Sequence, residues 1–269
     1  MLFYPSGETG CIFTPGKKSR RDLMLRELLV TLMDCRGTNG NYLFAKGRFV
    51  RRGFSADPSF ELTKSVIIKD SRTTTTGCAH GLFLKRYNSR GIWRTLKRSV
   101  QLPRAYECLA AALRLQQAGI ATPEVLLASR YYLITEALPE GTVFLNRTPE
   151  LTADAADVIA KMHDSGIYHG DLNLRNIYFL DGKYGFIDLD SAKLFPKGIP
   201  KTLRRKDMAR LVSSCAIEYI WRGEPLSEEE LEEFTNTLAN RYRMKTGAEL
   251  GDPELKARIQ YLIRRKRRG

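Results

Sequence analysis

The segment 167–190 constrains the fold of this chain more than any other stretch. Two of its carboxylates and one of its amides stand out by their order: Asp171, Asn176 five residues later, and Asp188 twelve residues beyond that. Between the last two, Asp181-Gly182 separates two apolar runs, which is the sequence signature of a tight β-hairpin. A hairpin there folds Asp188 back towards Asn176. Three oxygen-bearing side chains are therefore expected at one end of a two-stranded ribbon.

These residue types at this spacing indicate phosphate chemistry that uses magnesium. Mg²⁺ takes few protein oxygens and completes its shell with water and phosphate, and a carboxylate nearby can accept a proton from an attacking hydroxyl. The spacing resembles the catalytic loop and metal loop of the protein-kinase-like fold. The resemblance implies that Asp171 is the catalytic base, that Asn176 and Asp188 are the magnesium ligands, and that His169 supports the loop.

Two departures from the protein-kinase pattern narrow the class of kinase that this chain resembles. Gly170 stands where regulated protein kinases carry an arginine, and Asp188-Leu189-Asp190 replaces the usual Asp-Phe-Gly. Both departures occur in small-molecule and sugar kinases of the superfamily. Asp207, 19 residues after Asp188 and at the start of a predicted helix, resembles the aspartate that braces the catalytic loop from below. So short an interval leaves no room for a long activation segment, which disfavours a protein kinase.

Length, composition and charge indicate a globular chain, either one domain of two lobes or two small domains, with an anionic partner. The chain has 269 residues, 43% of them hydrophobic, and its five cysteines form no Cys-x-x-Cys pair, a usage typical of reduced cytoplasmic thiols. No apolar run is long enough to span a membrane, and the first 16 residues are unlike a signal peptide. The net charge of +14 makes nucleic acid, an anionic membrane and a polyanionic substrate the candidate partners.

The fold class expected is α+β with two lobes: a five-stranded antiparallel smaller lobe with one helix, and a mostly helical larger lobe. The expected parts are an N-terminal extension over 1–59, the smaller lobe over 60–138 and the larger lobe over 139–269. The five strands are predicted over 64–69, 73–78, 82–87, 125–128 and 131–137. Within the extension, the pattern predicts a helix over 22–33 and a strand or strand pair over 42–52.

Lys85 is the candidate lysine for nucleotide phosphates. Strand alternation puts Phe83, Lys85 and Tyr87 on one face, so Lys85 can point into a cleft. A lysine kept on an edge strand for solubility is the alternative. The resemblance implies that Lys85 neutralises the α- and β-phosphates of ATP and that Glu107, in the first turns of a helix predicted over 104–118, pairs with it.

Two further groups of residues are candidates for contact with ATP because of their positions in the first turn of the sheet and in the hinge between the lobes. The first turn of the sheet lacks a Gly-x-Gly-x-x-Gly loop, but Ser71, Arg72 and Thr73 offer hydroxyls, backbone amides and a guanidinium that can hold phosphate. A threonine-rich run is also ordinary strand sequence. By the resemblance, backbone atoms of Glu136 and Leu138 in the hinge between the lobes would meet the edge of adenine.

Basic segments are candidates for contact with an anionic surface or acceptor. The basic amphipathic helix predicted over 253–268 is typical either of membrane-surface binding or of a solubilising tail, and the basic segment 88–102 permits the same two interpretations. Six further basic residues precede or flank Asp207, where an acceptor would approach. They are Lys193, Lys197, Lys201, Arg204, Arg205 and Lys206.

Six short motifs together resemble the lipopolysaccharide core kinases that phosphorylate Kdo or heptose in Gram-negative bacteria. They are Arg72–Thr76, Leu84–Asn88, Gly119–Pro123, His169–Asn173, Phe186–Asp190 and Lys206–Leu211. The resemblance covers about residues 60–215. It implies transfer of the γ-phosphoryl group of ATP, with Mg²⁺, to a sugar hydroxyl of the core. The acceptor would be anionic lipopolysaccharide or lipid A at the cytoplasmic face of the inner membrane.

Three other functions stay open. A kinase of another small molecule, such as an aminoglycoside phosphotransferase, shares the catalytic loop but usually carries an acidic acceptor lobe, whereas this chain is basic. A protein kinase is disfavoured by Gly170 and the short interval before Asp207. A non-catalytic kinase-like module that binds membrane or nucleic acid is disfavoured because the candidate lysine, base and metal ligands are all present. Nucleic acid is not an expected partner.

Overall fold

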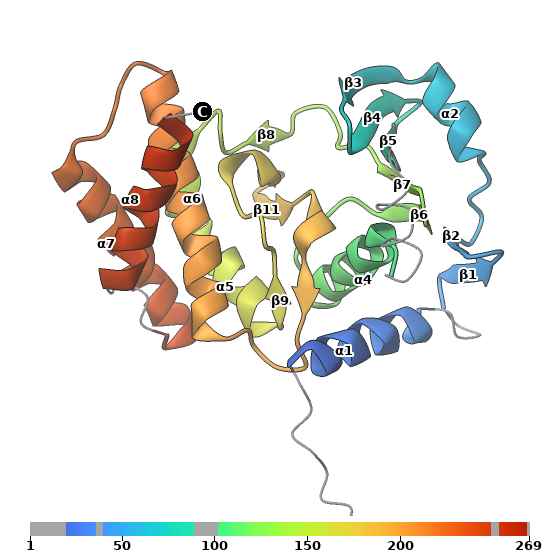
Figure 1. Ribbon diagram of the computed structural model, residues 1–269, viewed down its shortest axis with the longest axis horizontal. Coiled ribbons are helices and arrows are strands. Elements are labelled where there is room, and N and C mark those ends of the chain that lie inside the picture. Colours follow the sequence, from blue (N-terminus) through green and yellow to red (C-terminus); the bar gives the residue numbers. More distant parts are fainter. Residues whose placement is uncertain (1–19, 36–39, 89–101, 249–252, 268–269) are drawn as a thin grey trace, which may run out of the picture.

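The structure, a computed structural model, describes residues 20–35, 40–88, 102–248 and 253–267. A lobe built on a β-sheet and a larger lobe made mostly of helices lie side by side (Figure 1). The expected α+β architecture with two lobes is therefore confirmed. None of the helices in the described ranges combines the length and the apolar character needed to cross a membrane.

The smaller lobe contains a seven-stranded antiparallel sheet in the order β1-β2-β6-β7-β5-β4-β3. Its strands are β1 (Tyr42–Ala45), β2 (Arg48–Arg51), β3 (Val66–Asp70), β4 (Thr74–Ala79), β5 (Leu82–Tyr87), β6 (Val125–Ser129) and β7 (Tyr132–Glu136). The five expected strands are present, and β1 and β2 form a hairpin that adds two more by pairing along β6. The segment before residue 60 thus contributes to this sheet, while the domain boundary at residue 60 stays a prediction.

Two helices lie against one another beside the sheet. Helix α4 (Arg104–Gln117) buries an almost continuous set of small and apolar residues, including Ala105, Leu109 and Leu115. Helix α1 (Arg20–Asp34) lies along it (Figure 1), where an ion pair of 3.0 Å joins Arg114 to Glu27. Both helices were expected from their apolar spacing. A short helix, α2 (Pro58–Lys64), leads into β3.

The larger lobe combines helices with short strands that carry the catalytic segment. Its elements are β8 (Val143–Phe144), η1 (Pro149–Thr152), α5 (Ala156–Asp164), β9 (Ile167–Tyr168), η2 (Leu174–Asn176), β10 (Ile177–Leu180), β11 (Lys183–Phe186), η3 (Leu189–Ser191), β12 (Lys193–Leu194), α6 (Lys201–Trp221), α7 (Glu228–Thr246) and α8 (Pro253–Arg267). The β10–β11 hairpin turns at Asp181 (φ 48°) and Gly182 (φ 75°), the left-handed pair that a tight hairpin requires. The predicted hairpin is therefore confirmed.

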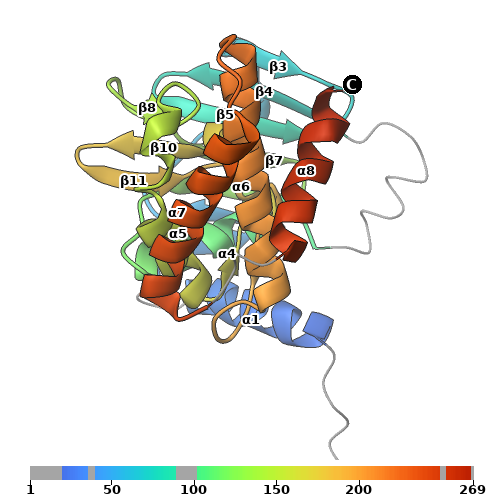
Figure 2. The ribbon, with the colours of Figure 1, turned by 90° about the vertical axis from the view of Figure 1, so that its left-hand side faces the viewer.

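Helices α6, α7 and α8 form the outer part of this lobe (Figure 2). Helix α6 begins at Lys201, so Asp207 lies in its second turn and not at its start as expected. Leu255, Ile259 and Ile263 of α8 are buried, and α8 packs against α6. The apolar stripe of the C-terminal helix is thus covered by protein. Its exposed residues include Arg264, Arg265 and Lys266, together with Glu254 and Tyr261, so a basic surface stays available for contact with an anionic surface.

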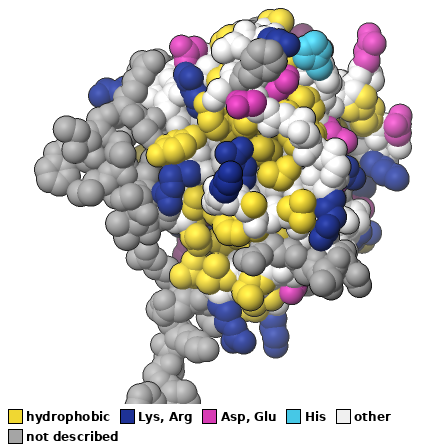
Figure 3. Space-filling model, turned by 90° about the vertical axis from the view of Figure 1, so that its right-hand side faces the viewer, with side chains coloured by type: hydrophobic (Ala, Val, Ile, Leu, Met, Phe, Trp, Pro, Cys, Tyr) yellow, Lys and Arg dark blue, Asp and Glu magenta, His cyan; other side chains and the backbone are white. Residues whose placement is uncertain are grey.

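Positive charge is also present on the smaller lobe. Seen from the side of β1, β2 and α2, Lys and Arg side chains lie among hydrophobic ones across the middle of the face (Figure 3). Of the two basic segments singled out in the sequence, most of 88–102 falls outside the described residues. The net charge of +14 is therefore spread over both lobes and is not a property of the C-terminal tail alone.

Candidate active site

A cavity of about 590 Å³ lies between the two lobes. The smaller lobe lines it with β-strand and α4 residues, the hinge with Glu136 and Leu138, and the larger lobe with Asn176, Asp188 and Asp190. Its volume is in the range typical of small-molecule and cofactor sites. Five of the residues predicted to bind nucleotide or metal thus line one cavity: Lys85, Glu136, Leu138, Asn176 and Asp188.

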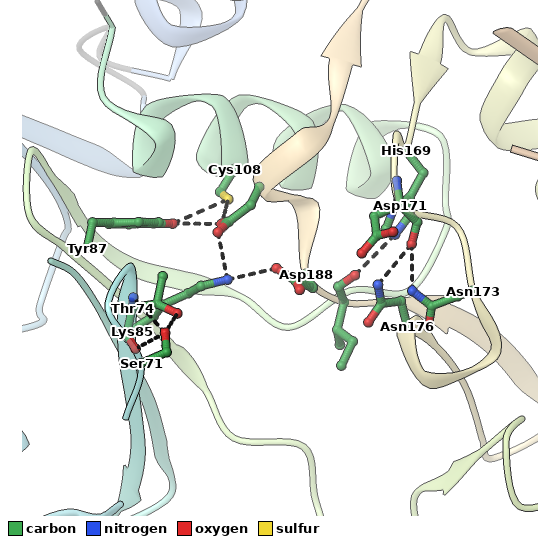
Figure 4. A network of polar contacts seen from close by, with 12 residues as sticks. Ser71, Thr74, Lys85, Tyr87, Cys108, His169, Asp171, Asn173, Asn176 and Asp188 are labelled. Carbon is green, nitrogen blue, oxygen red and sulfur yellow. Dashed lines mark hydrogen bonds and ion pairs between the residues drawn. The ribbon is translucent and has the colours of Figure 1, made fainter. Parts of the chain in front are cut away.

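Lys85 points into this cavity from β5, on the face that strand alternation predicted. Its Nζ lies 2.7 Å from Oδ1 of Asp188 and 2.7 Å from Oδ2 of Asp190, and only 12% of its side chain is exposed (Figure 4). Burial alone would lower the pKa of Lys85, but the carboxylates of Asp190 and Asp188 outweigh it and raise that pKa above its ordinary value. Lys85 is therefore a fixed positive charge.

The expected pairing of Lys85 with Glu107 is wrong in this structure. Among the described residues, Lys85 forms its ion pairs with the two aspartates, and Cys108 is the α4 residue that lines the cavity at this point. Successive helical residues are rotated by about 100°, so Glu107 faces elsewhere. Burial raises the pKa of Glu107, with the charges of Arg104 and Lys193 opposing the rise. A contact between Glu107 and ATP stays a prediction.

Asp190 is the site residue that sequence reasoning missed. Its Oδ1 accepts hydrogen bonds from Oη of Tyr87 (2.7 Å) and Sγ of Cys108 (3.0 Å), while its Oδ2 faces Lys85. Burial would raise the pKa of Asp190, but the Lys85 charge and these hydrogen bonds lower it below its usual value. The available signal was the second aspartate of Asp188-Leu189-Asp190, which we interpreted only as a departure from Asp-Phe-Gly.

Asp171 of the catalytic loop is exposed, and two asparagines of the loop fix the backbone behind it. Nδ2 of Asn173 and Nδ2 of Asn176 donate to the backbone oxygen of Asp171 at 3.0 and 2.9 Å (Figure 4). Asn173 also accepts from the backbone N–H of Arg175 at 3.0 Å, which starts the η2 turn. The carboxylate of Asp171 is thereby carried on a loop with few conformational options.

Asn176 and Asp188 fit a magnesium site. The amide nitrogen of Asn176 donates to the Asp171 carbonyl, which turns its amide oxygen the other way. Asp188 adopts a left-handed backbone (φ 56°), and its side chain is 42% exposed in the cleft. One amide oxygen and one carboxylate, with room for water and phosphate, match the few protein ligands that Mg²⁺ takes.

Asp207 lies beneath the catalytic loop and is completely buried. Its two oxygens accept the backbone N–H groups of His169 (2.9 Å) and Gly170 (3.1 Å). His169 in turn contacts the backbone oxygen of Ile187 through Nε2 at 3.1 Å, which ties the loop to the strand before Asp188. His163, also fully buried, lies 3.4 Å from Asp207. His169 and Asp207 thus hold the backbone of the catalytic loop in place, and their side chains do not face the cavity.

Gly170 has a geometric reason to lack a side chain. Its φ is +82°, and a Cβ built there would lie 2.3 Å from the backbone oxygen of Ser191. Its own carbonyl accepts a hydrogen bond from Arg210. An arginine in place of Gly170 would therefore collide with the η3 segment, so this departure from the protein-kinase pattern is built into the packing of the two loops.

Ser71, Arg72 and Thr73 lie in the turn between β3 and β4. The hydroxyl of Ser71 donates to the backbone oxygen of Thr74 (2.8 Å) and accepts from its N–H (3.1 Å), so it shapes the turn itself (Figure 4). From this part of the described chain, the cavity is lined by Ile68, Lys69, Thr74, Thr76 and Cys78. Phosphate contacts from residues 71–73 stay predictions, and Thr74 lies closer to the cavity.

Two of the basic residues expected to face an acceptor have structural roles instead. Arg204 is buried and donates to Asp164 and to Oη of Tyr242, each at 2.7 Å. Arg205 pairs with Glu254 at the start of α8. The expectation that these two arginines are presented to a substrate is therefore wrong, because both connect α6 to neighbouring helices.

The two lobes, the cleft between them and the lysine–aspartate pair at its centre define a protein-kinase-like fold. Among solved structures, WaaP in complex with acyl carrier protein is similar over 80% of this chain and 98% of that chain, at 18% identity and a TM-score of 0.51. A glucosamine kinase in complex with glucosamine, ADP and inorganic phosphate matches 75% of this chain and 74% of its own, at 13% identity and a TM-score of 0.48. No curated protein sequence matches the chain.

At the level of the family, the model of the lipopolysaccharide kinase (Kdo/WaaP) family matches residues 144–237. That segment runs from β8 into α7 and contains Asp171, Asn176 and Asp188. The resemblance to lipopolysaccharide kinases is thereby confirmed over the part of the chain that carries the catalytic loop and the metal loop.

Proposed function

We propose that this protein is an ATP-dependent kinase that transfers the γ-phosphoryl group to a sugar hydroxyl of the lipopolysaccharide inner core, on Kdo or heptose. The observation that carries the proposal is that the segment matched by the family model also lines the cavity between the lobes. The segment matched by the Kdo/WaaP family model brings Asn176 and Asp188 to the same cleft that Lys85 enters from the other lobe, and it holds Asp171 beside Asn176 through a hydrogen bond to the Asp171 backbone oxygen.

Each residue has a role that follows from its position. Asp171, exposed beside the cleft, orients the acceptor hydroxyl and accepts its proton as the oxygen attacks. Asn176 and Asp188 would hold Mg²⁺, which neutralises phosphate charge when bound. Lys85, kept charged by its two carboxylate neighbours, would turn to the phosphate oxygens of ATP. Transfer of this kind depends mostly on positioning and on charge.

The proposal includes an anionic acceptor at a membrane. The net charge of +14 supports a polyanionic partner such as the lipopolysaccharide core and lipid A. The exposed basic face of α8 and the basic side chains of the smaller lobe support contact with the cytoplasmic face of the inner membrane. On this basis the protein would bind the inner membrane peripherally from the cytoplasm.

The test is phosphate transfer from radiolabelled Mg-ATP to three acceptors in parallel: dephosphorylated lipopolysaccharide core, a soluble aminoglycoside and a generic protein. We expect labelling of the core alone. Asp171→Asn should lower the rate by about a hundredfold or more. Asp181→Asn is the matched control, since it removes a carboxylate from the hairpin turn of the same segment. Transfer to another acceptor, or transfer to core that survives Asp171→Asn, would refute the proposal.

A further inference from the structure

Trp221 ends helix α6 with its side chain largely at the surface. It is 59% exposed, and two cations lie against its ring: Cζ of Arg175 at 5.0 Å and Nζ of Lys266 at 5.7 Å from the ring centroid. We call these three residues the Trp221 cluster. They come from three different elements, the catalytic loop, α6 and α8, so the cluster forms only in the folded lobe.

One member of the cluster belongs to the catalytic loop, four residues after Asp171. Arg175 belongs to the catalytic loop itself, between Asp171 and Asn176, and its side chain is 59% exposed. Four residues span at most about 14 Å even when extended, so the Cα atoms of Arg175 and Asp171 lie within that distance. The loop is docked on α6 by a hydrogen bond of 3.1 Å from the backbone N–H of Leu174 to Ser214. Arg175 is therefore close enough along the chain for an extended acceptor to contact both it and Asp171.

The charges of the cluster are incompletely balanced. Glu218 pairs with Arg175 at 3.0 Å and fixes the direction of its guanidinium, but the cluster brings a second cation, Lys266, to the same indole. Two like charges near one ring repel each other. Helices α6 and α8 already pack through buried Leu255, Ile259 and Ile263, so the exposed cations are not needed to hold the helices together.

We infer that the Trp221 cluster is the acceptor subsite and that it binds the anionic part of a phosphorylated or carboxylated sugar. An arginine fork and an ammonium group recognise phosphate or carboxylate oxygens. The exposed part of the indole offers an apolar surface, with a polar edge, for the C–H face of a sugar ring. The inference rests on the proposed function and names the residues that would select an anionic acceptor, a role that Arg204 and Arg205 cannot fill.

The kinetic test compares Trp221→Ala and Lys266→Ala with Arg264→Ala, which removes an exposed charge from the same turns of α8. With dephosphorylated core oligosaccharide as acceptor, the first two variants should raise the acceptor KM by at least about tenfold, the factor for a lost hydrogen bond to a charged group. The KM for ATP should stay near the wild-type value, and Arg264→Ala should resemble the wild type. An unchanged acceptor KM in both cluster variants would overturn the inference.

A binding test separates this inference from the proposed activity. The chain has two tryptophans, so in a Trp93→Phe background Trp221 is the only indole reporter. Core oligosaccharide should quench its fluorescence without ATP, a neutral monosaccharide should not, and Lys266→Ala should abolish the quenching. Lys266-dependent quenching without phosphate transfer would uphold the subsite and refute the kinase proposal. Transfer to core without quenching would uphold the kinase proposal and overturn the subsite.

Discussion

Replacement of Asp207 by alanine should be among the most destabilising single changes in this protein. The side chain is completely buried and accepts two backbone N–H groups, from His169 and Gly170. A hydrogen bond to a charged group contributes about 1.5–3 kcal/mol, so the loss of both costs about 3–6 kcal/mol. That is a large share of the 5–15 kcal/mol by which folded proteins are typically stable.

The conservative variant Asp207→Asn should lose only part of this stabilisation. Asparagine keeps one acceptor oxygen but presents an NH₂ group to the second backbone N–H, so about half of the stabilisation should remain. We expect the order wild type, Asn, Ala in the free energy of unfolding, measured by urea denaturation followed by circular dichroism. Lys206→Ala, an exposed change on the same turn, should alter that free energy by less than about 0.5 kcal/mol.

The same two variants test whether Asp207 holds the catalytic loop in place. If it does, kcat should fall in Asp207→Asn under conditions in which the variant is fully folded, because the loop that carries Asp171 loses one of its two anchors. A loss of less than about 1 kcal/mol in Asp207→Ala, below the cost of a single buried hydrogen bond partner, would refute the reasoning. Equal losses in the two variants would show that the charge of Asp207 matters and that the one acceptor oxygen kept by asparagine does not.

Three further predictions concern neighbouring parts of the site. Asp190→Asn removes a carboxylate that orients Lys85, and kcat should fall by about a hundredfold, the effect of a small misplacement, as measured by steady-state kinetics with Mg-ATP. Burial lowers the pKa of His163 in the folded state, so the fold favours the neutral imidazole. The contribution of this neutral side chain to stability is therefore full above about pH 6.5, the ordinary pKa of histidine. It is lost as the pH falls through the lowered pKa of the folded state. His163→Gln should flatten the pH dependence of urea unfolding below pH 6.5 relative to wild type. Gly170→Ala places a Cβ against the Ser191 carbonyl at φ +82° and should cost about 1–3 kcal/mol of unfolding free energy, whereas an unchanged urea midpoint would contradict that geometry.

Local sequence patterns predicted the parts of the site that depend on neighbouring residues. The left-handed turn at Asp181-Gly182 follows from the dipeptide, and the direction of Lys85 follows from alternation along one strand. Both are properties of a few consecutive residues, so no knowledge of the rest of the fold was needed.

Contacts between distant residues could not be predicted in the same way. Tyr87 and Asp190 are 103 positions apart, and nothing in either local sequence identifies the other as its partner. Likewise, the amphipathic pattern of α8 correctly predicted a helix but did not say that α6 covers its apolar side. Arg204 and Arg205 were assigned to an acceptor for the same reason, because a run of basic residues does not show which of them lie at helix contacts.

The arrangement of Lys85 has a consequence for how such an enzyme could be controlled. In protein kinases the nucleotide lysine is paired with a helix, and the position of that helix can be used as a switch. Here the two ion-pair partners of Lys85 found among the described residues belong to Asp188–Asp190, the segment that also contains the proposed metal ligand. Among the described residues, α4 reaches this lysine only indirectly, through the hydrogen bond from Cys108 to Asp190, whereas a displacement of residues 188–190 would disturb the lysine and the proposed metal ligand together. The lysine and the proposed metal ligand are therefore mechanically one unit, and a change in the position of either is transmitted directly to the other.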